Sequence, residues 1–594
     1  MDRLLRIVGR VPRRVLTIAT IALGLVLCTP ALGVGLVADD LLQELFFRDK
    51  PGIDGISRRP FDLFRFASGD PAVARKLMNA GIFPWWADPR AILAFFRPLS
   101  CATHWIDHEL WPSRPWLMHA QSLLWFGVLL AIVSALYRRF ARGGGAAALA
   151  LFFYAVDDAH GPVVAWLANR NMIIALVFSM PSLIVHDRWR RDGYARGIWL
   201  APALLAIGLC AGEAAVAVFG YIVAYACFLD RGPTRSRLAS LVPYALVIAA
   251  WRVCYSHLGY GSYGSGLYVD PGRQPLSFIE IASTRLPILL LGQFALPWAD
   301  LWEMYPLVAP LVRPAVMGLA LLVLGALVLV MVPIWRRSAL ARFWSLGCVL
   351  AAIPSCATFP HDRLLLGSGV GAMAVVAQLI ATFAFDAAAS FPARAMTLGL
   401  ACVHGVLGPL LLPYRAYAVG EPNRLFTAAD DTIPCTEAVA ERTLIMVNPP
   451  IDPFAAYFSI YREAALRSRP RALLWLTTGV SAIDIRGVDD HTLSVRPTTG
   501  FWSSSSQLML RSLAHPLERG AVVSLDAGEI QVTDLTPDGR PLEVRVHFHK
   551  ALSDPSLLWV QWGAHGYVAF RPPSPDTRIR VPAVDMAKAF VLGS

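Results

Sequence analysis

The chain is dominated by a succession of apolar runs separated by short polar stretches, and many of these runs approach 20 residues. A helix needs about 20 consecutive apolar residues to cross a bilayer. Hydrophobic residues make up 56% of the 594 residues and charged residues only 16%, against roughly 45–50% and 25% in soluble domains. The sequence therefore predicts a polytopic α-helical membrane protein and excludes a soluble globular enzyme.

The arginines fall in short clusters between the apolar runs, so the net charge of +11 does not indicate a nucleic-acid-binding face. Such clusters mark the cytoplasmic side of membrane proteins. They predict about eleven spans in the cytoplasmic (inner) membrane, with the N-terminus in the cytoplasm and the C-terminus outside. The first run, 15–37, also resembles a signal peptide, but its length favours an uncleaved span.

The composition changes near residue 420, where apolar residues continue only in short runs separated by turn residues. We expect a multi-span membrane domain over 1–415 and a soluble, extracytoplasmic β-rich domain over 420–594. Two long outer loops, 38–115 and 258–313, interrupt the membrane domain.

Two further expectations concern these loops. Tryptophans such as Trp85 and Trp86 suit short helices that lie in the membrane interface. The apolar piece 288–298 is expected to be re-entrant or interfacial. A full span there would place the basic cluster that contains Arg336 and Arg337 outside the cytoplasm.

Two adjacent carboxylates, Asp39 and Asp40, follow the first span. Carboxylates beside a bilayer are costly to place, which suggests a function, although such a pair can also simply end a span in water. A carboxylate at an outer turn can serve as a general base for an acceptor hydroxyl.

Other charged and titratable groups recur at successive outer turns. They are Arg97, Asp158, His160, Arg170, Glu213, His361 and Arg363. Arg170 lies in an apolar run without an adjacent acid, so it either extends to the interface or serves as a cation for a phosphate. For Arg363 the simpler alternative is an ion pair with its neighbour Asp362.

The sequence gives no indication of a metal site. None of the nine cysteines forms a CxxC pair, and most lie inside apolar runs. The group His104, Asp107 and His108 has a spacing that fits no common metal site. We therefore expect no required cofactor, and nothing in the sequence supports a divalent metal.

An ordered set of motifs carries a family resemblance. The Asp39-Asp40 pair is followed by FRPLSCATHWIDHELW before the second span, then by HGPVVAWLANRN, AGEAAVA and PHDRLLLGSGVG. This set resembles the C superfamily of glycosyltransferases (GT-C). It is most similar to protein O-mannosyltransferases and to transmembrane mannosyltransferases with tetratricopeptide repeats.

The resemblance covers roughly residues 15–385 and has departures. Pro162 stands where the family has a Glu, Gly212 where it has a Lys, and the β-rich domain replaces the C-terminal repeats. The resemblance implies inverting transfer of a sugar from a polyprenyl-phosphate donor to a protein or glycan acceptor. It implies Asp39 or Asp40 as the base.

The same resemblance makes the cationic and imidazole groups candidates for the donor phosphate, namely Arg97, His160, Arg170 and Arg363. Asp158, Glu213 and His361 remain further candidates for the site. Two other functions stay open. One is a lipid or glycan transporter or flippase, and the other is a non-catalytic accessory protein of envelope assembly.

Overall fold

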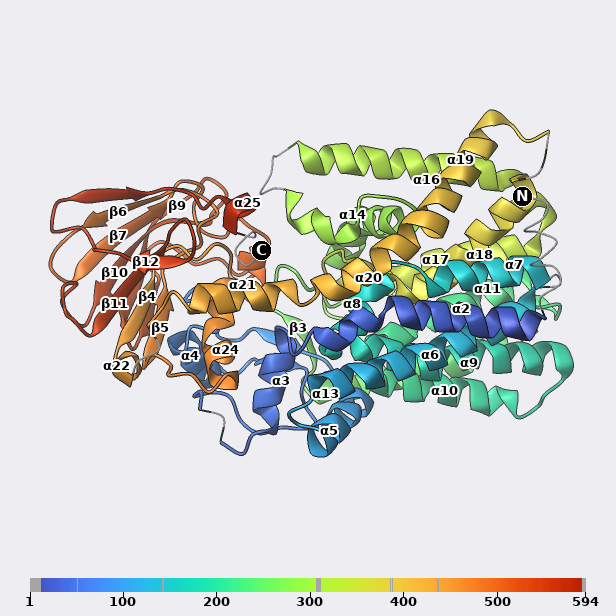
Figure 1. The fold of residues 1–594 in the computed structure, drawn as a ribbon, viewed down its shortest axis with the longest axis horizontal. Helices are drawn as coiled ribbons and strands as arrows, with labels where there is room; N and C mark the ends of the chain where they lie inside the picture. The colour runs from blue at the N-terminus through green and yellow to red at the C-terminus, as the bar shows by residue number, and fades with distance from the viewer. Residues whose placement is uncertain are drawn as a thin grey trace. The chain divides into compact units, whose positions relative to one another are not determined.

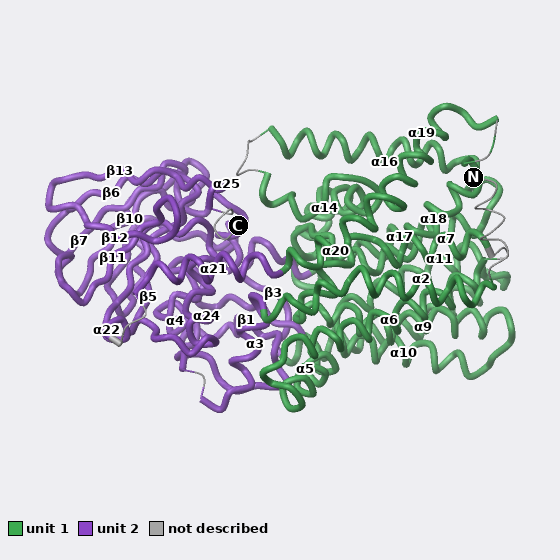
Figure 2. Tube along the Cα trace, in the orientation of Figure 1, with its two compact units in different colours: residues 1–36, 96–258, 271–419 green, residues 37–95, 259–270, 420–594 purple. Residues whose placement is uncertain are grey.

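The computed structural model describes residues 12–50, 52–141, 144–305, 311–384, 386, 388–434 and 437–589. The chain divides into two compact units, shown in different colours in Figure 2. Unit 1 comprises 1–36, 96–258 and 271–419, and unit 2 comprises 37–95, 259–270 and 420–594. Each unit is therefore assembled from three separate stretches of sequence.

Long apolar helices build unit 1 (Figure 1). Within the described residues, nine helical segments are long and apolar enough to cross a membrane. They are α2–η1 (Arg13–Gly33), α6 (Pro115–Phe140), η2–α9 (Leu167–Asp192), α12–α13 (Thr234–His257), α14 (Pro275–Phe294), α16 (Val312–Arg337), α17–η5 (Ala339–Ala357), η6–α18 (Asp362–Phe383) and α19–η7–α20–α21 (Phe391–Asp430). The chain is thus a polytopic α-helical membrane protein.

Three shorter apolar helices accompany them, namely α7 (Gly144–Ala155), α10 (Gly197–Ala211) and η3–α11 (Glu213–Phe228). Unit 1 also contains α5 (Pro98–Leu110), α8 (His160–Ala165) and η4 (Ala299–Glu303). Several long helices end in arginines, for example α6 at Arg138-Arg139. A cation is favourable there because the C-terminal end of a helix carries partial negative charge.

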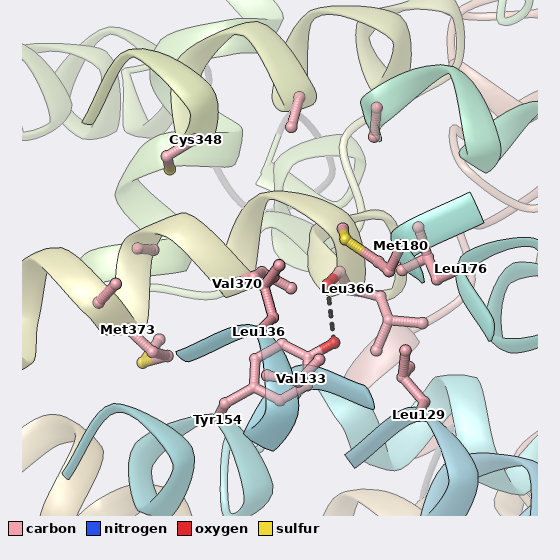
Figure 3. Close-up of a cluster of buried hydrophobic side chains, with 14 of the residues drawn as sticks. Leu129, Val133, Leu136, Tyr154, Leu176, Met180, Cys348, Leu366, Val370 and Met373 are labelled. Carbon is pink, nitrogen blue, oxygen red and sulfur yellow. Dashed lines mark hydrogen bonds between the residues drawn. The ribbon is translucent and has the colours of Figure 1, made fainter. Parts of the chain in front are cut away.

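One apolar core holds these helices together, with side chains from α6, α7, α9, α17 and α18 (Figure 3). The Tyr154 hydroxyl inside this core is satisfied by the chain itself, because it donates to the Leu366 carbonyl at 3.0 Å. Glycines let α18 approach its neighbours closely. A Cβ at Gly371 would lie 2.7 Å from the Trp344 carbonyl oxygen. Small residues commonly permit such contacts between membrane helices.

The apolar piece 288–298 overlaps the second half of α14, a continuous 20-residue helix over Pro275–Phe294. Its re-entrant or interfacial placement stays a prediction. The hydroxyls of Ser283 and Thr284 donate to the carbonyls of Glu280 and Ile281 one turn earlier, at 2.6 and 2.9 Å. The buried Arg285 donates to the Cys356 carbonyl. Satisfied in this way, the polar side chains are compatible with a membrane-length helix.

Unit 2 contains the expected β-rich region. A six-stranded antiparallel sheet has the order β13-β6-β7-β10-β9-β8, and a four-stranded sheet the order β12-β11-β4-β5. The strands are β4 (Thr443–Met446), β5 (Ala472–Trp475), β6 (Ile483–Gly487), β7 (Thr492–Pro497), β8 (Val522–Leu525), β9 (Gly528–Leu535), β10 (Pro541–Phe548), β11 (Leu557–Trp562), β12 (Tyr567–Ala569) and β13 (Arg578–Val581).

A third sheet joins the two loop segments of unit 2, with strands β1 (Arg65–Ser68), β2 (Ile92–Ala94) and β3 (Gly261–Tyr263) in that order. Helices complete the unit. They are α3 (Asp39–Phe47), α4 (Pro71–Asn79), α21 (Glu421–Asp430), α22 (Glu437–Ala440), α23 (Pro453–Ala456), α24 (Phe458–Ala464), η8 (Ser506–Leu508) and α25 (Met586–Ala589).

The interfacial placement expected for Trp85 and Trp86 was wrong, because both side chains are buried inside unit 2. Their indole N–H groups donate to the carbonyls of Leu476 and Gln507 at 3.0 and 3.1 Å. Trp475 donates in return to the Gly81 carbonyl. Segment 37–95 therefore shares a core with the β-rich region, whereas 96–115 belongs to the membrane unit.

Candidate functional site

The Asp pair forms the first turn of α3 in unit 2. The N-terminal end of a helix carries partial positive charge, so both carboxylates are favourably placed there. Ala38, the residue before them, has φ 50° in the left-handed region. A non-glycine residue there is strained, and such strain often accompanies function.

The two carboxylates have different surroundings. Asp40 is 3% exposed, and its Oδ2 accepts the backbone N–H of Val37 at 3.1 Å. Asp39 is half-buried, and its Oδ1 accepts the hydroxyl of Tyr457 at 2.5 Å. The carboxylate of Asp40 therefore stabilises the first turn of α3, whereas the carboxylate of Asp39 is more exposed and bonds to a distant side chain.

In unit 1, the guanidinium of Arg363 lies between two aromatic rings. Its Cζ is 5.0 Å from the ring centre of Trp166 and 5.6 Å from that of Phe359. Its Nη1 donates to Oδ1 of Asn169 at 2.9 Å. No ion pair joins Arg363 to any residue that the structure describes. Its neighbour Asp362 accepts instead from Arg415.

Three N–H groups of this cluster are buried without a hydrogen-bond acceptor among the described residues. They are Nε of Arg363, Nδ2 of Asn169 and Nε1 of Trp166. Asn169 is only 5% exposed. Each such donor costs about 1–3 kcal/mol, and one explanation for groups of this kind is an acceptor supplied by an ion or a water. We call Trp166, Asn169 and Arg363 the donor cluster.

Arg170 has the opposite environment, because it is fully buried and its N–H groups are hydrogen-bonded. Nη1 forms an ion pair with Asp107 at 2.5 Å, and Nε donates to Ser122 at 2.9 Å. The Gln121 side chain and the Met118 carbonyl accept the other bonds. The acid that the sequence lacked beside Arg170 is thus supplied by α5.

Of the two remaining predicted phosphate contacts, Arg97 is paired inside unit 1, whereas His160 packs on aromatic rings and its Nδ1 has no hydrogen-bond partner among the described residues. Arg97 forms an ion pair with Glu213 at 2.8 Å, and the Tyr255 hydroxyl donates to the same carboxylate at 3.2 Å. His160 is buried, and its ring centre lies 4.6 Å from that of Tyr154. The ion pair accounts for the position of Arg97, and the ring contact accounts for that of His160, without any ligand.

A second cluster surrounds Arg415 and brings together Asp158 and His361. The guanidinium contacts Asp158 at 3.1 Å, Asp362 at 2.5 Å, and Asp300. Nδ1 of His361 lies 2.7 Å from Asp300. Three carboxylates therefore share one arginine, which stabilises them through charge-assisted hydrogen bonds.

Burial and neighbouring charges shift the pKa values of the carboxyl groups near this second cluster. Burial raises the pKa of Asp157 to about 7, and the adjacent Asp158 adds to that shift. Burial alone would raise the pKa of Asp300, but His361 and Arg415 lower it below its ordinary value. Asp300 is therefore ionised at neutral pH, while Asp157 is partly protonated.

Within the described ranges, no three His, Cys, Asp or Glu side chains are arranged to hold a metal ion. Sequence reasoning missed Trp166, Asn169, Asp300, Arg415 and Tyr457. Arg415 could have been found, since it interrupts an apolar run as Arg170 does. The others carry no comparable signal, because their surroundings come from distant segments.

Comparison with known proteins gives only partial fold similarity. No protein-family model matches the sequence, and no curated protein is similar to it. The structure is similar to the oligosaccharyltransferase of Archaeoglobus fulgidus, tethered to an acceptor peptide, at 13% identity and TM-score 0.36. That match covers 77% of this chain and 64% of the archaeal one, so this chain spans less than two thirds of that enzyme.

A second similar structure is ArnT from Cupriavidus metallidurans, bound to undecaprenyl phosphate. The identity is 14% and the TM-score 0.33. The match covers 75% of this chain and 84% of ArnT.

Proposed function

We propose that this chain is a membrane glycosyltransferase of the GT-C type. It transfers a sugar from a polyprenyl-phosphate donor to a protein or glycan acceptor on the extracytoplasmic side of the membrane. The observation that carries the proposal is the donor cluster, which offers three unsatisfied N–H groups around one arginine in a polytopic membrane unit. The ordered motif resemblance of residues 15–385 supports it.

A phosphate suits the donor cluster chemically. Its oxygens accept several hydrogen bonds at once, and its negative charge matches the Arg363 guanidinium. Arginine is also retained in apolar surroundings better than a strongly hydrated ammonium group. Arg363 is accordingly the phosphate-binding arginine of this proposal, and Arg170 is a structural one because Asp107 neutralises it.

Asp39 is the proposed base, since Asp40 is buried and holds the Val37 N–H. Asp39 takes the proton of the acceptor hydroxyl. The acceptor oxygen then forms a bond to the anomeric carbon as the bond from that carbon to the phosphate oxygen breaks. The phosphate leaves with that electron pair, and a single displacement of this kind inverts the anomeric carbon.

The test is reconstitution of the full chain in liposomes with radiolabelled polyprenyl-phosphate sugars and an envelope extract as the source of acceptors. Label should pass from the lipid to the acceptor fraction. Asp39→Asn should abolish this transfer, whereas Asp40→Asn should retain a measurable rate. Asp54→Asn is the matched control, since this exposed carboxylate lies on the same unit.

Three results would contradict the proposal. If sugar transfer survives Asp39→Asn, Asp39 is not the base. Movement of the labelled lipid between leaflets without sugar transfer indicates a flippase. Absence of turnover with every donor tested indicates an accessory protein.

A further inference from the structure

The C-terminal part of the chain contributes one side chain directly to the proposed base. The hydroxyl of Tyr457, between α23 and α24, donates to Oδ1 of Asp39 at 2.5 Å. The two residues are 418 positions apart in sequence but belong to the same unit. No motif in the family resemblance includes this tyrosine.

Tyr457 is held firmly where it stands. Its ring stacks on Phe426 with 6.1 Å between centres and 15° between planes, and Phe426 in turn packs edge-on against Phe454. Its backbone N–H donates to the Pro453 carbonyl at 3.0 Å, which continues the turn of α23. An aromatic ring fixed on this framework presents its hydroxyl in one direction.

The hydroxyl of Tyr457 remains a donor at every physiological pH. Burial raises the pKa of Tyr457 well above its ordinary value, and the nearby charge of Asp39 adds to the effect. A phenol that keeps its proton donates to a carboxylate and stabilises the charged form of that carboxylate.

We infer that Tyr457 is a positioning residue that holds Asp39 ionised and correctly oriented to accept the acceptor's proton. This role rests on the proposed function. It gives the C-terminal region a part in the chemistry itself, because α24 packs against α3 and Tyr457, the residue directly before α24, makes the contact with Asp39. The hydrogen bond to Oδ1 restricts rotation of the Asp39 carboxylate, which directly follows the strained Ala38.

The test compares Tyr457→Phe with the wild type in the liposome assay. The substitution keeps the ring on Phe426 and removes only the hydroxyl. We expect kcat to fall about tenfold, as for loss of a hydrogen bond to a charged group, with KM for the donor unchanged. Tyr461→Phe is the matched control. Tyr461 lies on α24, and its hydroxyl accepts from Thr427 of α21 and not from Asp39, so this substitution should leave both constants unchanged.

The pH profile separates positioning from mere support of the fold. Loss of a bond to the charged form should move the acidic limb of the rate profile to higher pH. The other titratable groups facing this contact are Asp40 and Tyr268. Arg48 follows the end of α3 and forms ion pairs with Glu44 of α3 and Glu463 of α24. These groups are identical in the two proteins, so the shift reports the missing hydroxyl.

A second readout does not need activity. Thermal unfolding of wild type, Asp39→Asn, Tyr457→Phe and the double variant forms a cycle, and we expect the two substitutions to be non-additive. Additive changes in melting temperature would show that Asp39 and Tyr457 do not interact, and would overturn the proposed role of Tyr457. Loss of transfer in Asp39→Asn with an unchanged rate and pH profile in Tyr457→Phe would overturn this role alone. Transfer that survives Asp39→Asn would overturn the proposed base, and this role with it.

Discussion

Arg170 and Arg363 have nearly the same signature in the sequence but opposite surroundings in the structure. Each begins a long apolar helix, Arg170 at α9 and Arg363 in the short turn that leads into α18. Arg170 is completely buried, and Asp107, a hydroxyl, an amide and a carbonyl satisfy it. Arg363 donates to one neutral amide and keeps an unpartnered Nε.

The difference teaches how a cation in a membrane unit can be stabilised. A buried charge must be paired, and leaving it unpaired is strongly destabilising. Arg170 is paired by its own chain, so a ligand there would have to displace Asp107. Arg363 has no such carboxylate among the described residues, so an external anion can complete its surroundings. Four substitutions test this contrast.

Arg170→Met should have the largest effect, and the effect should be on folding. Removing the guanidinium leaves the carboxylate of Asp107 buried without its cation. We expect the free energy of unfolding to fall by about 3–5 kcal/mol, measured by thermal unfolding in detergent. The double variant with Asp107→Asn should recover part of the loss. An unchanged melting temperature in the single variant would contradict the conclusion that Arg170 is a structural cation paired with Asp107.

Arg363→Ala should leave the fold largely intact but weaken anion binding. No buried acid loses its partner, so the melting temperature should change little. The dissociation constant for a polyprenyl phosphate, the donor class of the proposed function, should rise about 100-fold in a titration in detergent micelles, because a charge-assisted contact is lost. Arg424→Ala is the control, since Arg424 forms an exposed ion pair with Glu421. Equal binding by both variants would contradict the assignment.

Asn169→Asp should make the surroundings of Arg363 resemble those of Arg170. The Asn169 side chain already lies 2.9 Å from Nη1 of Arg363, so a carboxylate there would neutralise the guanidinium and repel a phosphate. We expect the affinity for the polyprenyl phosphate to fall about tenfold without loss of thermal stability. Retained affinity would show that the anion does not bind at this cluster.

Trp166→Phe should have the smallest effect. A phenyl ring keeps the contact between ring and guanidinium, which is 5.0 Å in the structure, and removes only the indole N–H. Loss of this single hydrogen bond to the phosphate corresponds to a reduction in affinity of about tenfold or less. The same titration measures it. A loss as large as that of Arg363→Ala would indicate that the ring itself, and not its N–H, binds the ligand.

Much of the fold could be predicted from local sequence. Hydropathy placed the membrane-length helices, and the change near residue 420 marked the β-rich region. The full length of α14 was missed because only its apolar second half stands out in the sequence, whereas its first half contains Ser283, Thr284 and Arg285. The burial of Trp85 and Trp86 was missed because their carbonyl partners lie about 400 residues further along the chain.

The candidate site, like the fold, was predictable only where it depends on local sequence. The sequence by itself determined that this is a polytopic membrane protein with charged groups at the ends of its helices, because hydropathy and charge are properties of short segments. Only the tertiary structure decided which charges are already paired and which keep open donors. It also separated Asp39 from Asp40 and brought Tyr457 to Asp39. Those outcomes depend on contacts between distant segments, and pairing across the chain is fixed only when the core packs.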